Sequence, residues 1–268
     1  MFYNAKNCIL NIDNTTVDYI SFGKGIKNLI IIPGVGDGFK TVKGLAIPFS
    51  IMYKIFAKEY RVYVFSRRNM LSENFSTKDM ANDIINHMNE LKIDSADIVG
   101  VSQGGMIAQY IAINAPDKVN KLVLVVTGAR NNKILDNNIA EWIKMAEEKN
   151  YKGIMLDNAK KSYTGKYLKS GIKMAKIIGL FDKNIDYKRF IIQAKSCVEH
   201  DLFDRLDKIK CQTLIIGAKQ DKVIGIEASE ELNKQIINSK LYVYDEYSHA
   251  VYEQAKDFNS RVLNFLIK

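Results

Sequence analysis

Short apolar runs alternate along the chain with segments of helical spacing. Runs such as NLIIIP, KLVLVV and TLIIG are apolar at consecutive positions, as is typical of strands buried on both faces of a parallel sheet. The pattern predicts eight strands, at 8–12, 17–22, 29–33, 61–66, 97–101, 121–126, 212–217 and 240–244. Since the first two are close together and mix polar with apolar residues, we expect an antiparallel hairpin at the sheet edge.

Helical periodicity fills the gaps between most of these runs. A helix is predicted over 77–91, with Ser76 or Thr77 as its cap. Three more are predicted at 103–114, 226–237 and 252–267. Alternating strands and helices indicate an α/β fold with a mostly parallel eight-stranded sheet and helices on both faces.

The alternation stops between residues 128 and 200. This stretch is helical in pattern and contains no convincing strand. We interpret it as a helical cap, or lid, inserted into a core made of residues 1–127 and 201–268. Its large side chains either line an apolar pocket or pack within the cap; they are Trp142, Met145, Met155, Tyr163, Tyr167, Leu168 and Met174.

Composition narrows the class of protein. The chain has 268 residues, 47% of them apolar, which is enough for one large core. No apolar run approaches a membrane span, and the first residues lack the pattern of a secretory signal. Cys8, Cys197 and Cys211 are sparse and odd in number, which favours reduced thiols in a cytoplasmic protein. No Cys/His cluster has metal-ligand spacing, and we expect no metal and no cofactor.

The net charge of +9 has two interpretations. It is compatible with an anionic partner or substrate. A chain rich in Lys, Ile and Asn is also what a biased, AT-rich coding sequence produces, and we favour that simpler origin. Residues 128–200 hold 15 Lys and Arg against 8 Asp and Glu, so most of the surplus lies in the predicted cap. No nucleic-acid-binding motif is present, and we expect no nucleic-acid partner.

The motif Gly100-Val101-Ser102-Gln103-Gly104 lies between a predicted strand and a predicted helix. A strand that turns at once into a helix holds the central serine in strained backbone geometry, and Gly100 and Gly104 remove the collisions that side chains would cause there. In this context we predict that Ser102 is a nucleophile; a plain Gly/Ser-rich turn is the alternative.

A serine hydroxyl needs a base, and the chain has three histidines. His249 follows the last predicted strand, at the edge of the sheet where Ser102 would lie. His200 lies where the cap rejoins the core, and His87 is expected on a helix surface. We choose His249 as the base, with His200 as the alternative.

The base needs a carboxylate to orient it. Asp221 follows the predicted strand 212–217 and falls in the same row of loops as Ser102 and His249. It could instead be an ordinary turn residue, and Asp245 is a rival because it is nearer His249 in sequence. We choose Asp221.

An oxyanion hole needs two donors. The backbone N–H of Gln103 follows the nucleophile, and the N–H of Val35 belongs to the glycine-rich loop PGVGDG after the third strand. An ordinary glycine-rich turn is the alternative for that loop.

These residues resemble the α/β-hydrolase superfamily over nearly the whole chain. The segments that carry the resemblance are IIPGVGDG, GVSQGGMIAQYIA, KLVLVV, TLIIGAKQD and YSHAVYEQAKDF. Within the superfamily, the chain most resembles esterase-like bacterial members that have a cap and a PG-hydrophobic-GDG loop. It implies the α/β-hydrolase fold, a lid, and a triad of Ser102, Asp221 and His249. Two departures stand out: Pro33 replaces the histidine common in the oxyanion loop, and Ser248 replaces a glycine common before the catalytic histidine.

The function that follows is carboxylic-ester hydrolysis of a small or medium acyl substrate, through an acyl-enzyme and without a cofactor. The same triad also supports C–C hydrolysis, acyl transfer or perhydrolysis, and a non-catalytic ligand receptor is a remote alternative. The expected partner is a small molecule, with an anionic substrate as one hypothesis from the charge of the cap. A homodimer stays open.

Overall fold

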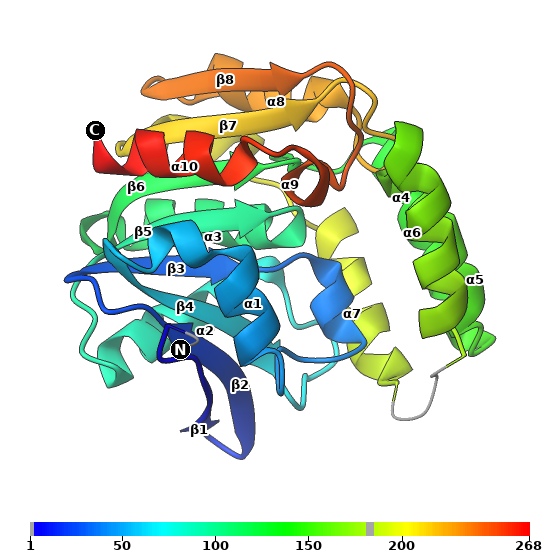
Figure 1. Ribbon diagram of the computed structural model, residues 1–268, viewed down its shortest axis with the longest axis horizontal. Coiled ribbons are helices and arrows are strands. Elements are labelled where there is room, and N and C mark those ends of the chain that lie inside the picture. Colours follow the sequence, from blue (N-terminus) through cyan, green and yellow to red (C-terminus); the bar gives the residue numbers. More distant parts are fainter. Residues whose placement is uncertain (1–2, 181–184) are drawn as a thin grey trace.

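One eight-stranded sheet runs through the computed structural model, which describes residues 3–180 and 185–268. Along the sheet the order is β1-β2-β4-β3-β5-β6-β7-β8 (Figure 1). The strands are β1 (Lys6–Ile12), β2 (Thr15–Phe22), β3 (Lys27–Ile32), β4 (Tyr60–Arg68), β5 (Ala96–Val101), β6 (Val119–Val125), β7 (Gln212–Ala218) and β8 (Ser239–Tyr244). All eight predicted strands are therefore present.

The sheet is antiparallel at one edge and parallel elsewhere. β1 pairs with β2, and β2 with β4, in antiparallel register, which confirms the predicted edge hairpin. β4, β3, β5, β6, β7 and β8 pair in parallel. Their carboxyl ends consequently share one edge of the sheet, where the loops that carry chemistry are expected in this class of fold.

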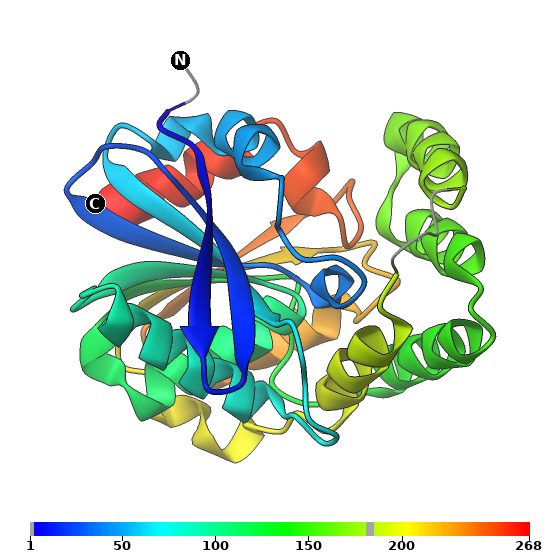
Figure 2. The same ribbon diagram turned by 90° about the horizontal axis from the view of Figure 1, so that it is seen from below.

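Helices cover both faces of the sheet (Figure 2). One face packs against α1 (Ala46–Met52), α9 (Val251–Gln254) and α10 (Phe258–Ile267). The other packs against α2 (Thr77–Glu90), α3 (Gln103–Asn114) and α8 (Ile226–Gln235). Both interfaces are built from fully buried aliphatic strand residues such as Ile30 and Val123, so the sheet is the centre of the hydrophobic core.

Among the residues that the structure describes, four α-helices lie between β6 and β7. They are α4 (Lys133–Glu147), α5 (Tyr151–Ser162), α6 (Gly165–Ile178) and α7 (Tyr187–Val198). Figure 1 shows them beyond the strand arrowheads, at the carboxyl edge of the parallel strands. Trp142 of α4, Phe190 of α7 and Phe39 of the core contribute to one shared apolar cluster. The helices therefore pack on the edge where the site residues were predicted.

The structure differs from the sequence prediction in three places. Helix α1 was not predicted. The predicted helix 252–267 is interrupted, because Ala255 is extended and ends α9 before Asp257 begins α10. His87 was expected on a helix surface, which is wrong: its side chain is buried against the ring of Phe65.

Candidate active site

Ser102 occupies a sharp turn between β5 and α3. Its backbone has φ 52° and ψ −121°, a left-handed conformation that costs a non-glycine residue on the order of 1–3 kcal/mol. Two hydrogen bonds hold the turn: the Ser102 N–H donates to the Val125 carbonyl at 2.9 Å, and the Thr127 hydroxyl donates to the Ser102 carbonyl at 2.7 Å. The conformation predicted for the nucleophile turn is therefore present.

The two glycines around Ser102 are required by close backbone contacts. A Cβ on Gly100 would lie 2.4 Å from the Gly104 carbonyl oxygen, and a Cβ on Gly104 would lie 2.0 Å from the Ile32 oxygen. Both contacts are with backbone atoms, which cannot swing away as a flexible side chain can. Strand β5, helix α3 and the end of β3 thus approach one another more closely than any side chain permits.

His249 and Asp221 meet at the carboxyl edge of the sheet. His249 follows β8 and Asp221 follows β7, and the distance from His249 Nδ1 to Asp221 Oδ2 is 2.8 Å. The other Asp221 oxygen accepts from the N–H groups of Val223 and Ile224, at 2.8 and 3.1 Å. A carboxylate held by two backbone donors keeps one oxygen free to orient the imidazole ring.

The rival residues lie elsewhere. Asp245 is exposed and pairs with Lys219 at 3.5 Å. His200 is buried against Thr77, with 3.0 Å between Nδ1 and the hydroxyl, and burial lowers its pKa to about 4. His87 is likewise buried on α2, and burial lowers its pKa to about 4. Both of these histidines are neutral at pH 7, away from Ser102.

Ser102 and His249 line the same cavity, of about 450 Å³. Within the described residues, no direct hydrogen bond joins their side chains. Without a substrate, catalytic hydrogen bonds are often long, and they tighten when one binds. Of the three predicted triad residues, Asp221 and His249 form a hydrogen-bonded pair, and His249 shares a cavity with Ser102.

The predicted oxyanion donors flank this cavity. Val35 begins a short 3₁₀ turn, Val35–Gly38, and lines the cavity wall; Gln103 is the first residue of α3. In the described chain, neither the Val35 N–H nor the Gln103 N–H donates to another protein group. Two uncommitted N–H groups beside a nucleophile are what an oxyanion hole requires.

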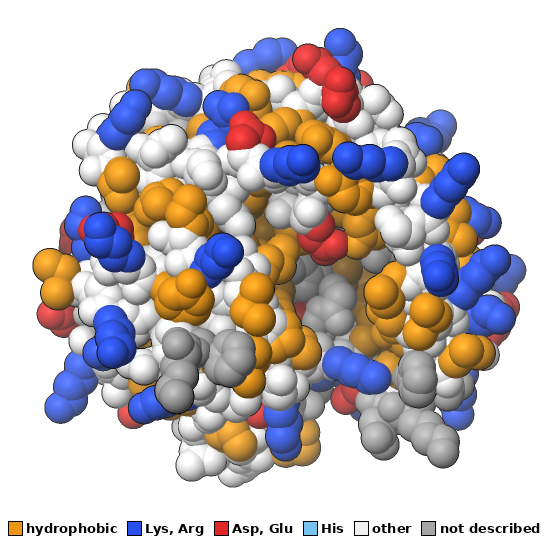
Figure 3. Space-filling view, viewed as in Figure 1, with side chains coloured by type: hydrophobic (Ala, Val, Ile, Leu, Met, Phe, Trp, Pro, Cys, Tyr) orange, Lys and Arg blue, Asp and Glu red, His pale blue; other side chains and the backbone are white. Residues whose placement is uncertain are grey.

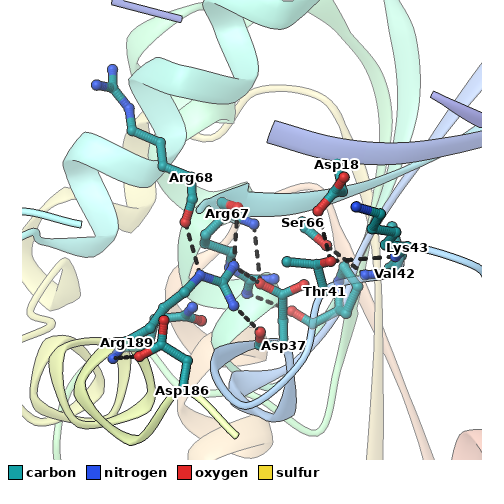
Figure 4. Close-up of polar contacts among 12 residues, drawn as sticks. Asp18, Asp37, Thr41, Val42, Lys43, Ser66, Arg67, Arg68, Asp186 and Arg189 are labelled. Atoms are coloured by element: carbon teal, nitrogen blue, oxygen red, sulfur yellow. Dashed lines mark hydrogen bonds and ion pairs between the residues drawn. The ribbon is translucent and has the colours of Figure 1, made fainter. Parts of the chain in front are cut away.

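A buried polar cluster behind the oxyanion loop was not predicted (Figure 4). The Arg189 guanidinium pairs with Asp37 Oδ2 at 2.6 Å and donates to the Arg67 carbonyl at 2.9 Å. Arg67 in turn donates to the carbonyl of Pro33 at 2.5 Å and to the Gln103 side chain at 2.9 Å. Arg67 therefore supports the loop in which Pro33 replaces the usual histidine. The signal available in the sequence was a pair of arginines ending a buried strand, YRVYVFSRR.

Gln103 also has a role that its sequence position did not reveal. Its fully buried side-chain amide donates to the Gln193 carbonyl at 2.7 Å and to the Ser196 hydroxyl at 3.1 Å. Both acceptors belong to α7. The residue after the nucleophile thus joins the core to the helices between β6 and β7.

A second contact joins these helices to the loop of His249. The carbonyl of Ser162, the last residue of α5, accepts a hydrogen bond from the Ala250 N–H at 3.0 Å. The Ser248 hydroxyl donates to the Lys161 carbonyl at 2.6 Å. Ser248, where a glycine is common in the resembling family, therefore anchors the histidine loop to α5.

The cavity wall is mostly apolar and aromatic, with few charges. Its ionisable members other than His249 and the tyrosines are Asp37, Lys40 and Glu253, and Asp37 is paired with Arg189. Glu253 faces the cavity and accepts a short hydrogen bond from the Tyr163 hydroxyl, while desolvation raises the pKa of its carboxyl. The wall residues from α4, α5 and the turn after α5 are Trp142, Asn158, Ser162 and Tyr163. All four are uncharged at neutral pH.

The described residues contain neither a metal-binding cluster nor a helix suited to a membrane. No group of three or more His, Cys, Asp or Glu there is placed to hold a metal ion. None of the helices there combines the length and apolarity needed to cross a membrane.

Comparison with known proteins agrees with the fold. Residues 27–153 match the family model described as alpha/beta hydrolase fold. A 2-hydroxy-6-oxononadienedioate/2-hydroxy-6-oxononatrienedioate hydrolase of Escherichia coli O139:H28 is 24% identical, over 98% of this chain and 96% of that protein.

Solved structures give the same result. An α/β-hydrolase enzyme from a Medee basin deep-sea metagenome library superimposes with a TM-score of 0.86 at 21% identity, covering 97% of this chain and 98% of that one. The enol-lactonase of Burkholderia xenovorans LB400 superimposes with a TM-score of 0.81 at 18% identity, covering 97% and 100%. The chain has the α/β-hydrolase fold. This agrees with the resemblance to the α/β-hydrolase superfamily that its motifs indicated.

Proposed function

We propose that the protein is a serine hydrolase that cleaves carboxylic esters of small or medium acyl groups. The observation that carries the proposal is Ser102, at a positive φ in the wall of a cavity that His249 also lines, with His249 hydrogen-bonded to Asp221. A strained residue in a cavity, beside an oriented base, is the arrangement that nucleophilic catalysis needs.

The mechanism follows from these positions. The Ser102 hydroxyl oxygen attacks the ester carbonyl carbon while His249 Nε2 accepts the hydroxyl proton. The N–H groups of Val35 and Gln103 stabilise the oxyanion, and the C–O bond breaks as His249 returns the proton to the leaving alcohol. Water, deprotonated by His249, then attacks the acyl-enzyme and releases the acid and free Ser102. Asp221 keeps the imidazole in the productive tautomer and stabilises its protonated form.

We also propose that residues 128–200 act as the cap, with residues 1–127 and 201–268 as the core; residues 181–184 lie outside the described part of the chain. The contacts of Gln103 with α7 and of Ser162 with the histidine loop support this division. A cap attached at both points contributes wall residues and excludes water from the acyl-enzyme.

C–C bond hydrolysis is the second candidate, because the Escherichia coli relative is named as the hydrolase of a dioate. The charge of the wall favours the ester. A substrate with two carboxylates would face Glu253, and the described residues of the cap supply no cation to the wall. The lysine of the wall, Lys40, belongs to the core and is exposed to solvent, which weakens its pull on a bound anion. The same observation weakens the hypothesis that the positive charge of the cap selects an anionic substrate.

Labelling with a fluorophosphonate followed by peptide mapping tests the nucleophile. We expect label on Ser102, loss of label and of p-nitrophenyl ester turnover in Ser102→Ala, and retention of both in Ser162→Ala, the matched serine of the same wall. Label on another residue, or turnover by Ser102→Ala, contradicts the proposal. Ester, thioester and 1,5-diketone substrates compared at equal concentration separate the reaction classes, and no turnover of any would favour a receptor.

A further inference from the structure

Exposed apolar side chains gather on two segments that border the mouth of the cavity. On α1, Ile47 and Ile51 are 46% and 52% exposed, and on α6, Met174, Ile177 and Ile178 are 55%, 43% and 38% exposed. Figures 1 and 2 both place α6 on the same side of the sheet as α1. Figure 3 shows a hollow in this face with apolar side chains on both of its banks. These five residues are called the rim below.

The rim belongs to the site rather than to an unrelated surface. Leu45, Phe49 and Met52, from α1 and the residue before it, line the cavity that contains Ser102. On the other bank, α6 begins two residues after Tyr163, which also lines the cavity. A molecule held on the rim would therefore lie directly over the entrance to the nucleophile.

The two segments that carry the rim are positively charged. Residues 39–57 and 165–180 contain no Asp or Glu. They contain seven lysines, all exposed: Lys40, Lys43, Lys54, Lys166, Lys169, Lys173 and Lys176. Apolar side chains mixed with lysines on a helix are typical of segments that lie on anionic lipid surfaces, where the apolar groups insert and the lysines meet the headgroups.

We propose that the rim docks on an anionic lipid–water interface and opens the cavity toward it. The two banks of the rim are separated by a hollow. A fluid lipid surface can contact both banks at once, whereas a folded protein would need a shape that fills the hollow. The positive charge of the cap then acts on its outer face, where exposed lysines contact anionic headgroups. Binding to a lipid surface does not depend on whether Ser102 cleaves esters.

Vesicle co-sedimentation of the full chain without substrate tests the proposal. We expect binding to vesicles of phosphatidylcholine mixed with phosphatidylglycerol. Binding to pure phosphatidylcholine should be at least tenfold weaker, and added salt should weaken the binding to mixed vesicles. Failure to bind mixed vesicles at low salt overturns the proposal. Ser102→Ala should bind as well as the wild type, which keeps this result separate from that of the proposed catalysis.

Matched variants locate the binding surface. Ile177→Ser with Ile178→Ser should weaken vesicle binding at least tenfold. Ile26→Ser with Ile237→Ser should leave vesicle binding unchanged. Ile26 and Ile237 are 97% and 77% exposed and lie just before β3 and β8, at the amino ends of the parallel strands and therefore opposite the cavity. Equal losses in the two pairs contradict the proposal.

Two triple variants test the role of the lysines, one on α6 and one elsewhere as its control. Lys169→Gln, Lys173→Gln and Lys176→Gln together should remove the preference for phosphatidylglycerol, whereas Lys24→Gln, Lys208→Gln and Lys240→Gln together should retain it. All six side chains are exposed. Retained preference in the first triple variant overturns the proposal. So does a stable dimer that the Ile177/Ile178 variant dissociates, since a second copy would then occupy the rim.

Discussion

At the scale of single residues, environment separates two carboxylates that the sequence leaves as rivals. Asp221 is buried, with one oxygen on two backbone N–H groups and the other on His249. Asp245 is exposed and pairs with Lys219 at the surface. We therefore predict that Asp221→Asn lowers kcat for a p-nitrophenyl ester by about 10²–10⁴-fold, because an amide can stabilise the wrong tautomer of the ring. Asp245→Asn is the control and should change kcat less than twofold; equal effects would exclude Asp221.

His87 supplies a prediction about stability. Burial, helped by the Arg68 guanidinium, lowers its pKa from 6.5 to about 4. Between these values the unfolded chain binds the proton and the folded chain does not, so the free energy of unfolding falls as the pH is lowered through this range. His87→Leu should therefore lose about 2 kcal/mol less stability than the wild type between pH 7.5 and pH 5. Urea unfolding at both pH values measures the difference, and parallel pH profiles would contradict it.

The placement of Ser102, Asp221 and His249 at one edge of the sheet was predictable, because each lies in the loop after a recognisable strand and parallel strands end at one edge. The role of the Gln103 side chain was not predictable, because its acceptors lie 90 or more residues away on α7. His87 was misplaced for a related reason. A histidine in a helix is usually solvated, and only the tertiary structure shows the ring against Phe65.

At the scale of elements, the Asp37–Arg189 pair joins the 3₁₀ turn of the oxyanion loop to α7. Both side chains are nearly inaccessible, and Arg67, whose pKa burial lowers to about 10, stays charged beside them at neutral pH. Asp37→Asn should destabilise the fold by about 3–5 kcal/mol, because two buried guanidinium groups lose their carboxylate. Asp13→Asn removes a carboxylate from Arg68 at the surface and should cost at most about 1 kcal/mol. Chemical unfolding of the two variants measures the loss in the free energy of unfolding. Similar losses would show that burial does not set how much each ion pair contributes to stability.

The strands were predictable because a short, continuous apolar run bounded by polar residues is typical of a strand buried on both faces of a sheet. Helix α1 was not, because its seven residues, AIPFSIM, include Pro48 and span barely two turns. The break before α10 also escaped the periodicity. Asp257 there accepts a hydrogen bond from the Tyr244 hydroxyl at the end of β8, and a contact with another element leaves no periodic signal.

At the scale of the whole molecule, charge is divided between the outside and the cavity. The chain carries +9, and the lysines of 165–180 are exposed, whereas the cavity wall contains Glu253 together with a single lysine, Lys40, among the described residues. The outer charge therefore says little about what the cavity accepts. Glu253 is exposed at the cavity wall, so solvent screens part of its repulsion of an anionic ester. The other carboxylate of the wall, Asp37, is paired with Arg189, so we expect Glu253 to set the preference between neutral and anionic substrates.

The ratio of kcat/KM for an ester bearing a carboxylate, such as p-nitrophenyl hemisuccinate, to that for p-nitrophenyl acetate tests this role. Both substrates use the same catalytic residues, so effects of pH on the chemical step cancel in the ratio. Desolvation raises the pKa of Glu253; lowering the pH through that pKa neutralises the carboxyl, and the ratio should rise. Glu253→Gln should raise the ratio on the order of tenfold at pH 8 and remove its pH dependence. Glu246→Gln, at an acidic residue absent from the wall, is the control, and a ratio that stays low in Glu253→Gln would mean that another group excludes the anion.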